Sequence, residues 1–178
     1  MSEPSVLAPR PVRAVLFACR WCALLGADRA GRERLDLPAV FRVIPVECAA
    51  AVEPDLVLRA LADGADGVAV LGCHLGGCRH DEANRSAKVR LDLLGDLLDA
   101  VGLDRRRLLL SWGTAHEAAQ FAGLVCDFAA ALEELPAPDP GLFPLRQGSD
   151  ASCLSGSSSR PRPCWRRRKS TARPPHRR

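Results

Sequence analysis

The sequence predicts an α/β protein whose parallel sheet has about four strands, helices on both faces and cysteines at its carboxyl edge, followed by a disordered tail. Short apolar runs alternate with segments of helical periodicity between residues 13 and 135. Alternation of this kind implies parallel strands joined by right-handed crossovers. Three of the apolar runs end at or beside a cysteine, and the hydrophobic pattern stops at residue 136.

The predicted strands are short apolar runs bounded by turn residues. The first follows Pro11, which separates it from the preceding segment. The second contains Pro45, which lacks an amide hydrogen for the ladder and therefore indicates an edge strand or a strand end. The third is apolar throughout, which indicates burial on both faces. The strands are expected at residues 13–19, 41–46, 66–71 and 108–112.

The predicted helices follow from periodicity and from residues that start or stop helices. Pro54 suits the first turn of the second helix, and Gly64 suits its C-terminal end. Asp81 is expected to cap the third helix, and Thr114 with Glu117 has the capping-box spacing before the fourth. The helices are expected at residues 21–34, 53–63, 82–101 and 114–135. The apolar residues at helical spacing in the third are Leu91, Leu94, Leu97, Leu98 and Val101.

Composition divides the chain into a loose leader at residues 1–12, the α/β body at 13–135 and a Pro/Ser/Arg-rich tail at 136–178. Residues 141–178 carry a net charge of +9, whereas residues 1–140 carry −5. The tail has too few apolar residues to offset its ordering entropy, so we expect it to be disordered. It lacks interleaved aromatic residues and any folded nucleic-acid-binding motif, so nucleic acid is not the expected partner.

The chain has eight cysteines in 178 residues. A body of this size folds without disulfides, so the thiols indicate metal binding or catalysis in a reducing compartment. The apolar start of the body resembles a signal peptide, but Arg20 interrupts it. No apolar segment approaches the about 20 residues that a bilayer requires, so we expect a cytoplasmic protein without a membrane partner. Cys126 falls in the apolar register of the fourth helix and is expected to pack in the core.

The strongest functional signal is the segment Gly-Cys-His-Leu-Gly-Gly-Cys at residues 72–78. It is expected just past the carboxyl end of a strand, where open α/β sheets bind their ligands. Other cysteines follow the first and second strands in the same way. Because parallel strands end at one edge of a sheet, these thiols are expected to converge there. They are Cys19, Cys22, Cys48, Cys73 and Cys78.

Three chemistries are open to such a group of thiols. Four thiolates could hold a structural zinc or an iron–sulfur cluster. Cys19 and Cys22 at the start of a helix could instead form a redox pair of the thioredoxin type. Zinc ribbons usually carry their ligands on short hairpins, so ligands on the loops of a parallel sheet favour iron–sulfur.

Several motifs resemble those of the delta subunit family of methyl-viologen-reducing hydrogenases, over about residues 14–134. The family's Cys-Cys-x-Trp-Cys motif corresponds to residues 18–22, and its Gly-Ala-Asp-Gly-Val strand start to residues 64–68. Its Gly-Cys-His-x-Gly-x-Cys motif is complete at residues 72–78. Further matching positions are Gly26, Ala27, Asp28, Gly31, Trp112, Thr114, Ala115, Glu117 and Phe121.

The resemblance implies an electron-transfer subunit with a [2Fe-2S] cluster and no substrate chemistry of its own. It would pass electrons from a hydrogenase, or another electron-donating enzyme, to the flavoprotein subunit of a heterodisulfide reductase complex. The five cysteines named above would supply its four ligands, with Cys48 either a ligand or a thiol lining the site. Alternative functions are a zinc-bound or cofactor-less adaptor, and a thiol–disulfide oxidoreductase that uses Cys19 and Cys22.

The residues around the thiols have two interpretations each. The backbone amides of Gly72, Gly76 and Gly77 could donate hydrogen bonds to cluster sulfurs, or the glycines could simply form a tight turn. Trp21 could shield the cluster from water or anchor the first helix.

The sequence departs from the family pattern in three places. Ala18 stands where the family has the first cysteine of its pair, and Gly77 replaces an acidic residue. Ala50 and Ala51 replace a Gly-Arg pair after Cys48. Five cysteines still stand at family positions, so four ligands remain available.

Overall fold

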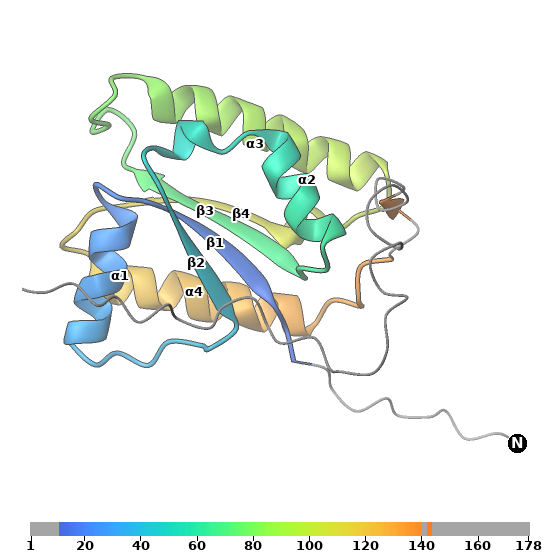
Figure 1. Cartoon of the computed structure of the whole chain (residues 1–178), viewed down its shortest axis with the longest axis horizontal. Coiled ribbons are helices and arrows are strands. Elements are labelled where there is room, and N and C mark those ends of the chain that lie inside the picture. The colour runs from blue at the N-terminus through green and yellow to red at the C-terminus, as the bar shows by residue number, and fades with distance from the viewer. Residues whose placement is uncertain (1–10, 140–141, 144–178) are drawn as a thin grey trace, which may run out of the picture. The chain divides into compact units, whose positions relative to one another are not determined.

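The computed structural model describes residues 11–139, 142 and 143. These residues form a four-stranded parallel sheet in the order β2-β1-β3-β4, which confirms the predicted fold class (Figure 1). The strands are β1 (Ala14–Cys19), β2 (Phe41–Val46), β3 (Gly67–Cys73) and β4 (Leu108–Gly113). The helices are α1 (Ala23–Arg32), η1 (Ala49–Ala51), α2 (Pro54–Ala62), α3 (Ala83–Ala100), η2 (Arg105–Arg107) and α4 (Ala118–Glu133).

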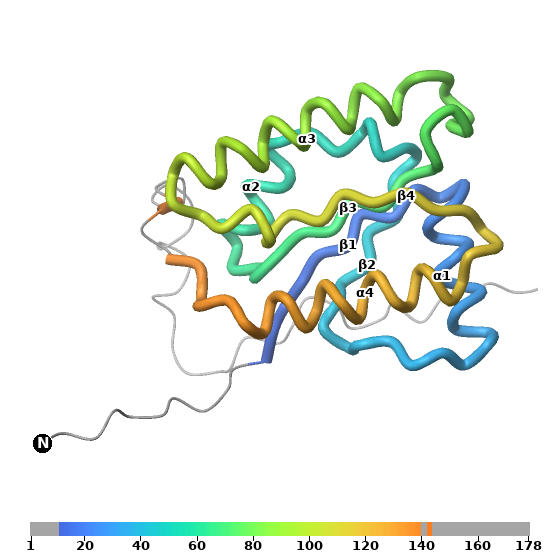
Figure 2. Tube along the Cα trace, turned by 180° about the vertical axis from the view of Figure 1, so that it is seen from behind, coloured from blue at the N-terminus to red at the C-terminus, as the bar shows by residue number. Residues whose placement is uncertain are grey.

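Helices cover both faces of the sheet. Helices α1 and α4 lie on one face, and α2 and α3 lie on the other (Figures 1 and 2). Each face has its own core of buried side chains, centred on Leu16 and Val125 on the α1/α4 side and on Val70 and Leu91 on the α2/α3 side. As the proline in its sequence indicated, β2 is an edge strand.

Strand β3 is longer than the sequence predicted and is buried along its whole length. It extends to Cys73, because Gly72 pairs with Trp112 and Cys73 pairs with Gly113 of β4. A Cβ atom on Gly72 would lie 2.7 Å from the Trp112 ring and 3.0 Å from the Ala49 side chain. Gly72 therefore belongs to the strand, and its missing side chain makes room for the indole.

The helix starts differ from the predicted caps. Helix α3 begins at Ala83, and Asp81 adopts a left-handed conformation with φ 52° instead of capping the helix. Helix α4 begins at Ala118, later than predicted. The Glu117 carboxylate accepts a hydrogen bond from the Thr114 amide at 2.7 Å, so half of the expected capping box forms. Gly64 has φ +93° at the end of α2, as its predicted role there requires, and Gly102 has φ +84° just after α3.

The expectation that Cys126 packs in the core is wrong, because Cys126 is exposed and its Sγ lies 3.7 Å from the carbonyl oxygen of Asp36. Of the apolar residues at helical spacing in α3, Leu97 and Val101 are 54% and 58% exposed, because α3 presents Leu91, Leu94 and Leu98 to the sheet. Helical spacing identifies an apolar stripe, but a helix on one face of a sheet buries only part of it.

The leader up to residue 10 and the tail at residues 140–141 and 144–178 lie outside the described residues. Phe143, which the sequence placed in the tail, is buried against the α2/α3 core with Leu98 and Leu103. Over the part of the chain that the structure describes, every helix is too short or too polar to cross a bilayer.

Candidate metal centre

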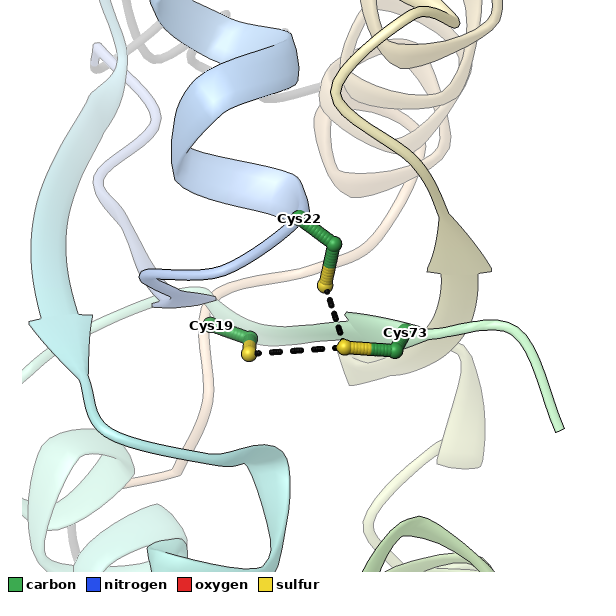
Figure 3. Close-up of side chains that lie close together, drawn as sticks. All are labelled: Cys19, Cys22 and Cys73. Carbon is green, nitrogen blue, oxygen red and sulfur yellow. Dashed lines mark hydrogen bonds between the residues drawn. The ribbon is translucent and has the colours of Figure 1, made fainter. Parts of the chain in front are cut away.

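Three thiols from separate elements meet at the carboxyl edge of the sheet (Figure 3). Cys19 ends β1, Cys22 occupies the N-cap position of α1, and Cys73 ends β3. The Sγ of Cys73 lies 2.9 Å from that of Cys22 and 3.8 Å from that of Cys19, and all three sulfurs lie within 4.8 Å of one another. We call these residues the thiol triad; all three are buried.

The other two predicted thiols form a pair beside the triad. Cys48 precedes η1 and Cys78 lies in the loop before α3, and their sulfurs are 3.8 Å apart. Burial raises the pKa values of Cys48 and Cys73, and charge on a thiol of the other group, Cys19 for Cys48 and Cys78 for Cys73, adds to this rise. The fold thus brings all five predicted cysteines to one edge, as three plus two.

None of these five cysteines is in a disulfide. The shortest sulfur–sulfur separation, 2.9 Å between Cys22 and Cys73, is well beyond the about 2.05 Å of a disulfide bond. The donor set is made only of thiols, which are the ligands that zinc and iron–sulfur clusters prefer. The residues present therefore fit a thiolate-bound metal centre.

The thiols differ in acidity. Hydrogen bonding from the Cys22 thiol lowers the pKa of Cys19 from its ordinary value of 9.0 to about 6. The same contact raises the pKa of Cys22 far above its usual range, because Cys22 must keep its proton to donate it. Burial is the main cause of the raised pKa values of Cys48 and Cys73. Cys19 is therefore the most acidic thiol of the triad and the first to ionise as the pH rises.

The glycines of the loop after β3 form a turn. Gly76 has φ +84°, a conformation that favours glycine. The Gly77 amide donates to the carbonyl oxygen of His74 at 2.9 Å. Donation from Gly72, Gly76 and Gly77 to cluster sulfurs stays a prediction.

Trp21 connects three segments around the thiols. Its Nε1 donates to the Glu47 carboxylate at 2.9 Å, and the Arg79 guanidinium lies 4.1 Å from the centre of its ring. Glu47 also accepts from Arg20 at 2.9 Å, and both hydrogen bonds lower the pKa of its carboxyl group, Trp21 contributing most. Trp21 therefore links the turn between Cys19 and Cys22 to the segments that carry Cys48 and Cys78.

Asn84 supports the site, although no sequence motif pointed to it. It lies in the first turn of α3 with only 1% of its surface exposed. Its Nδ2 donates to the backbone carbonyls of Cys73 and His74, at 2.9 Å each, and its buried Oδ1 has no hydrogen-bond partner. A polar residue in the buried register of α3, with Ala87 and Leu91, is the signal that could have found it.

A second support joins the loop after β3 to the loop after β4. The His74 Nε2 lies 2.9 Å from the Glu117 carboxylate, which also accepts from the Thr114 amide. Both interactions lower the pKa of Glu117, the His74 contact most. Beside this pair, an open hollow of about 380 Å³ reaches Cys22 and Cys73 from the surface.

A parallel α/β body with a thiol centre at the carboxyl edge defines a protein built to hold a metal or cluster on cysteines. Comparison with known proteins narrows this class. The chain belongs to the family described as methyl-viologen-reducing hydrogenase, delta subunit, whose pattern it matches over residues 14–136.

Named relatives fall into two groups. The chain is 40% identical over 121 residues to the iron-sulfur subunit of the F420-non-reducing hydrogenase of Archaeoglobus profundus, an alignment that covers 68% of this chain and 88% of that one. It is 39% identical over 109 residues to the vhc iron-sulfur subunit of the same type of hydrogenase from Methanococcus voltae, covering 61% and 76%. It is also 40% identical over 121 residues to one subunit of the ferredoxin:CoB-CoM heterodisulfide reductase of Methanosarcina mazei. That alignment covers 68% of this chain but only 15% of the longer protein.

Proposed function

We propose that this chain is an electron-transfer subunit whose thiol edge holds a [2Fe-2S] cluster. It relays electrons from a hydrogenase or similar donor to a heterodisulfide-reductase-type flavoprotein. We place this function in the body at residues 13–135 and treat the tail at 136–178 as an appendage. When bound, such a cluster accepts and releases one electron, at a potential set by charge, hydrogen bonding and solvent exposure.

The observation that carries the proposal is the arrangement of the thiols as a triad and an adjacent pair. A single zinc needs four ligands at about 2.3 Å, which places the sulfurs of a tetrahedral cage of four thiolates about 3.8 Å from one another. Among the described residues, only the triad brings three donors within 4.8 Å of one another, and no fourth donor joins it; the sulfurs of Cys48 and Cys78, 3.8 Å apart, form a separate pair. A [2Fe-2S] cluster takes four thiolates, two on each of its irons, so two neighbouring groups of thiols suit it better.

Residues of this chain would prepare the site in three ways. The lowered pKa of Cys19 supplies a thiolate at neutral pH. Burial of Cys19, Cys22 and Cys73 excludes water from most of the donor set. Asn84 holds the backbone at Cys73 in place through its two hydrogen bonds.

We infer the partners from the names of the relatives and the compartment from the free thiols. One group of relatives is named for hydrogenases and the other for heterodisulfide reductases, and this chain would connect two such proteins. The five free thiols fit a reducing compartment, so we assign the protein to the cytoplasm.

A thiol–disulfide exchange function suits the geometry less well. Such enzymes present an accessible low-pKa thiol to their substrate, whereas Cys19, the acidic thiol here, is buried. A third sulfur, that of Cys73, also lies 2.9 Å from Cys22, which a simple Cys-x-x-Cys redox pair does not need.

The relay is tested by mixing the anaerobically purified, chemically reduced chain with a purified heterodisulfide-reductase-type flavoprotein. We expect the flavin to be reduced in step with reoxidation of the chain's visible chromophore, with about one electron transferred per chain. A chain that carries colour but never reduces the flavin would contradict the relay. A colourless chain with bound zinc would support the adaptor alternative.

A further inference from the structure

An apolar groove runs along the edge strand β2 on the α2 side of the sheet. We call it the β2 groove; its volume is about 740 Å³. Its floor includes Val15, Phe17 and Ile44, and Leu56 of α2 forms part of its wall. Ile44 is 37% exposed and Leu56 38% exposed, which is high for side chains of this size in a sheet core.

The groove exists because the sheet extends one strand beyond its helical cover. Helices α2 and α3 pack on β3 and its neighbours, while β2 lies outermost on that side (Figure 1). The carbonyl oxygens of Val40 and Val46 accept hydrogen bonds from the β1 side. By the two-residue alternation of a strand, the amides of Phe41 and Val43 therefore point away from β1. Pro45 has no amide hydrogen, so this free edge is short.

The rim of the groove is basic. Arg13, Arg42 and Arg59 line it, and Asp63 is the one acidic residue among its lining residues. All three arginines are exposed, and none forms an ion pair with another residue in the described part of the chain. Most other exposed arginines of this body pair with an acidic neighbour, for example Arg20 with Glu47. An apolar floor with unpaired cations above it favours an occupant of matching chemistry.

We propose that the β2 groove docks a protein partner that lays an extended apolar segment, flanked by Asp or Glu side chains, along β2. Apolar side chains of the segment cover Ile44 and Phe17, its carboxylates pair with the three arginines, and its backbone bonds the free amides of Phe41 and Val43. This is strand addition to a sheet edge, in which backbone bonds give affinity and alternate side chains give specificity.

Two alternative occupants, the C-terminal tail and a second copy of the chain, do not complement the positive charge of the groove rim. Residues 141–178 of the chain itself carry a net charge of +9 and would meet a rim of the same sign. A second copy paired about a two-fold axis would bring two copies of the same basic rim together, and like charges repel one another across such an interface.

The β2 groove contains none of the five cysteines of the metal centre. Docking at the groove would therefore leave the hollow beside Cys22 and Cys73 open for electron exchange. The probe for docking is the proposed acceptor flavoprotein, so the inference rests on the proposed function. Cluster content, measured on the same samples, separates failure of the groove from failure of the metal site.

The experiment measures the dissociation constant of the full-length chain for the purified flavoprotein by isothermal calorimetry at low and high salt. The first variant, Arg42→Glu with Arg59→Glu, reverses the rim charge, and the second, Ile44→Asp, places a charge on the floor. Arg34→Glu with Arg85→Glu is the charge-matched control, since both residues are exposed and lie outside the groove. Circular dichroism and iron content check that each variant is folded and loaded.

We expect each groove variant to bind about tenfold or more weakly, with iron content unchanged and the control within about twofold of the wild type. Added salt should weaken the wild type more than the rim variant, because the rim charges are exposed and screened. Wild-type affinity in both groove variants, or no binding by a loaded wild-type chain, would overturn the proposal. So would a concentration-dependent dimer that Ile44→Asp abolishes, because a second copy would then occupy the groove.

Discussion

At the residue scale the proposed metal centre is expected to depend most on Cys73, whose Sγ is the shared neighbour of the Cys22 and Cys19 sulfurs. Replacing Cys73 with Ser removes the sulfur that lies 2.9 Å and 3.8 Å from those two. We expect the variant to lose at least half of its bound iron and its visible colour after anaerobic purification. Cys126→Ser is the matched control, because Cys126 is exposed and lies in the middle of α4. Full iron content in Cys73→Ser would remove this residue from the ligand set.

The acidity of Cys19 predicts a pH dependence in the metal-free protein. Its folded-state pKa is lowered to about 6, so the thiolate contributes stability above the ordinary pKa of 9.0, and this contribution is lost as the pH falls through about 6. We expect thiolate absorbance in the ultraviolet to titrate near pH 6. In Cys22→Ala this transition should move toward higher pH, because the main donor to Cys19 is gone. If the transition does not move in Cys22→Ala, it belongs to a group other than Cys19.

Asn84 predicts a stability effect that no surface asparagine would show. Asn84→Ala removes the side-chain donor to the buried carbonyl of Cys73 and one of the two donors to the His74 carbonyl, which keeps the Gly77 amide; we expect a cost of about 2 kcal/mol of unfolding free energy. Denaturant titration measures it, with the exposed Ser86→Ala as the control on the same helix, expected within about 0.5 kcal/mol of the wild type. Equal stability of the two variants would show that water replaces the amide.

At the scale of elements, the contact between β3 and β4 controls where Cys73 lies. Gly72→Ala places a Cβ atom 2.7 Å from the Trp112 ring, so the strand or the indole must shift. We expect a loss of about 1 to 3 kcal/mol in thermal or chemical unfolding. Gly123→Ala, in an exposed position of α4 with nothing within 4 Å, should instead stabilise by up to about 1 kcal/mol. If Gly72→Ala left the free energy of unfolding unchanged, the Trp112 indole would have to move freely.

Much of the architecture follows from the sequence because strand burial and helix periodicity are local properties. The apolar run before Gly72 and the proline at position 45 predict a central and an edge strand, and both predictions are confirmed. The end of β3 could not be predicted, since it depends on pairing with β4, which is distant in sequence. Exposure of Cys126 and Leu97 likewise depends on which part of a helix stripe meets the sheet.

The candidate site, too, could be predicted from the sequence only in part. Convergence of five thiols follows from the parallel direction of the strands, which the alternating pattern implies. Their grouping as three plus two depends on loop geometry that spacing does not encode. The role of Asn84 could not be predicted because its partners are backbone carbonyls, which no side-chain motif records.

At the scale of the whole molecule, the protein has two surfaces with different chemistry. The carboxyl edge carries the thiol centre with Trp21, His74 and Glu117 around it, and the β2 groove offers apolar surface under a basic rim. A relay protein needs both a place for the electron and a place for its partner. The two surfaces share no lining residue, so substitutions can address them one at a time.

The most direct test of the electron relay is the iron and acid-labile sulfide content of the full chain, purified without oxygen and checked by visible absorption and electron paramagnetic resonance after reduction. We expect about two iron and two sulfide per chain, with a signal of one unpaired electron in the reduced state. A colourless protein with about one zinc and no sulfide would contradict the electron-transfer function.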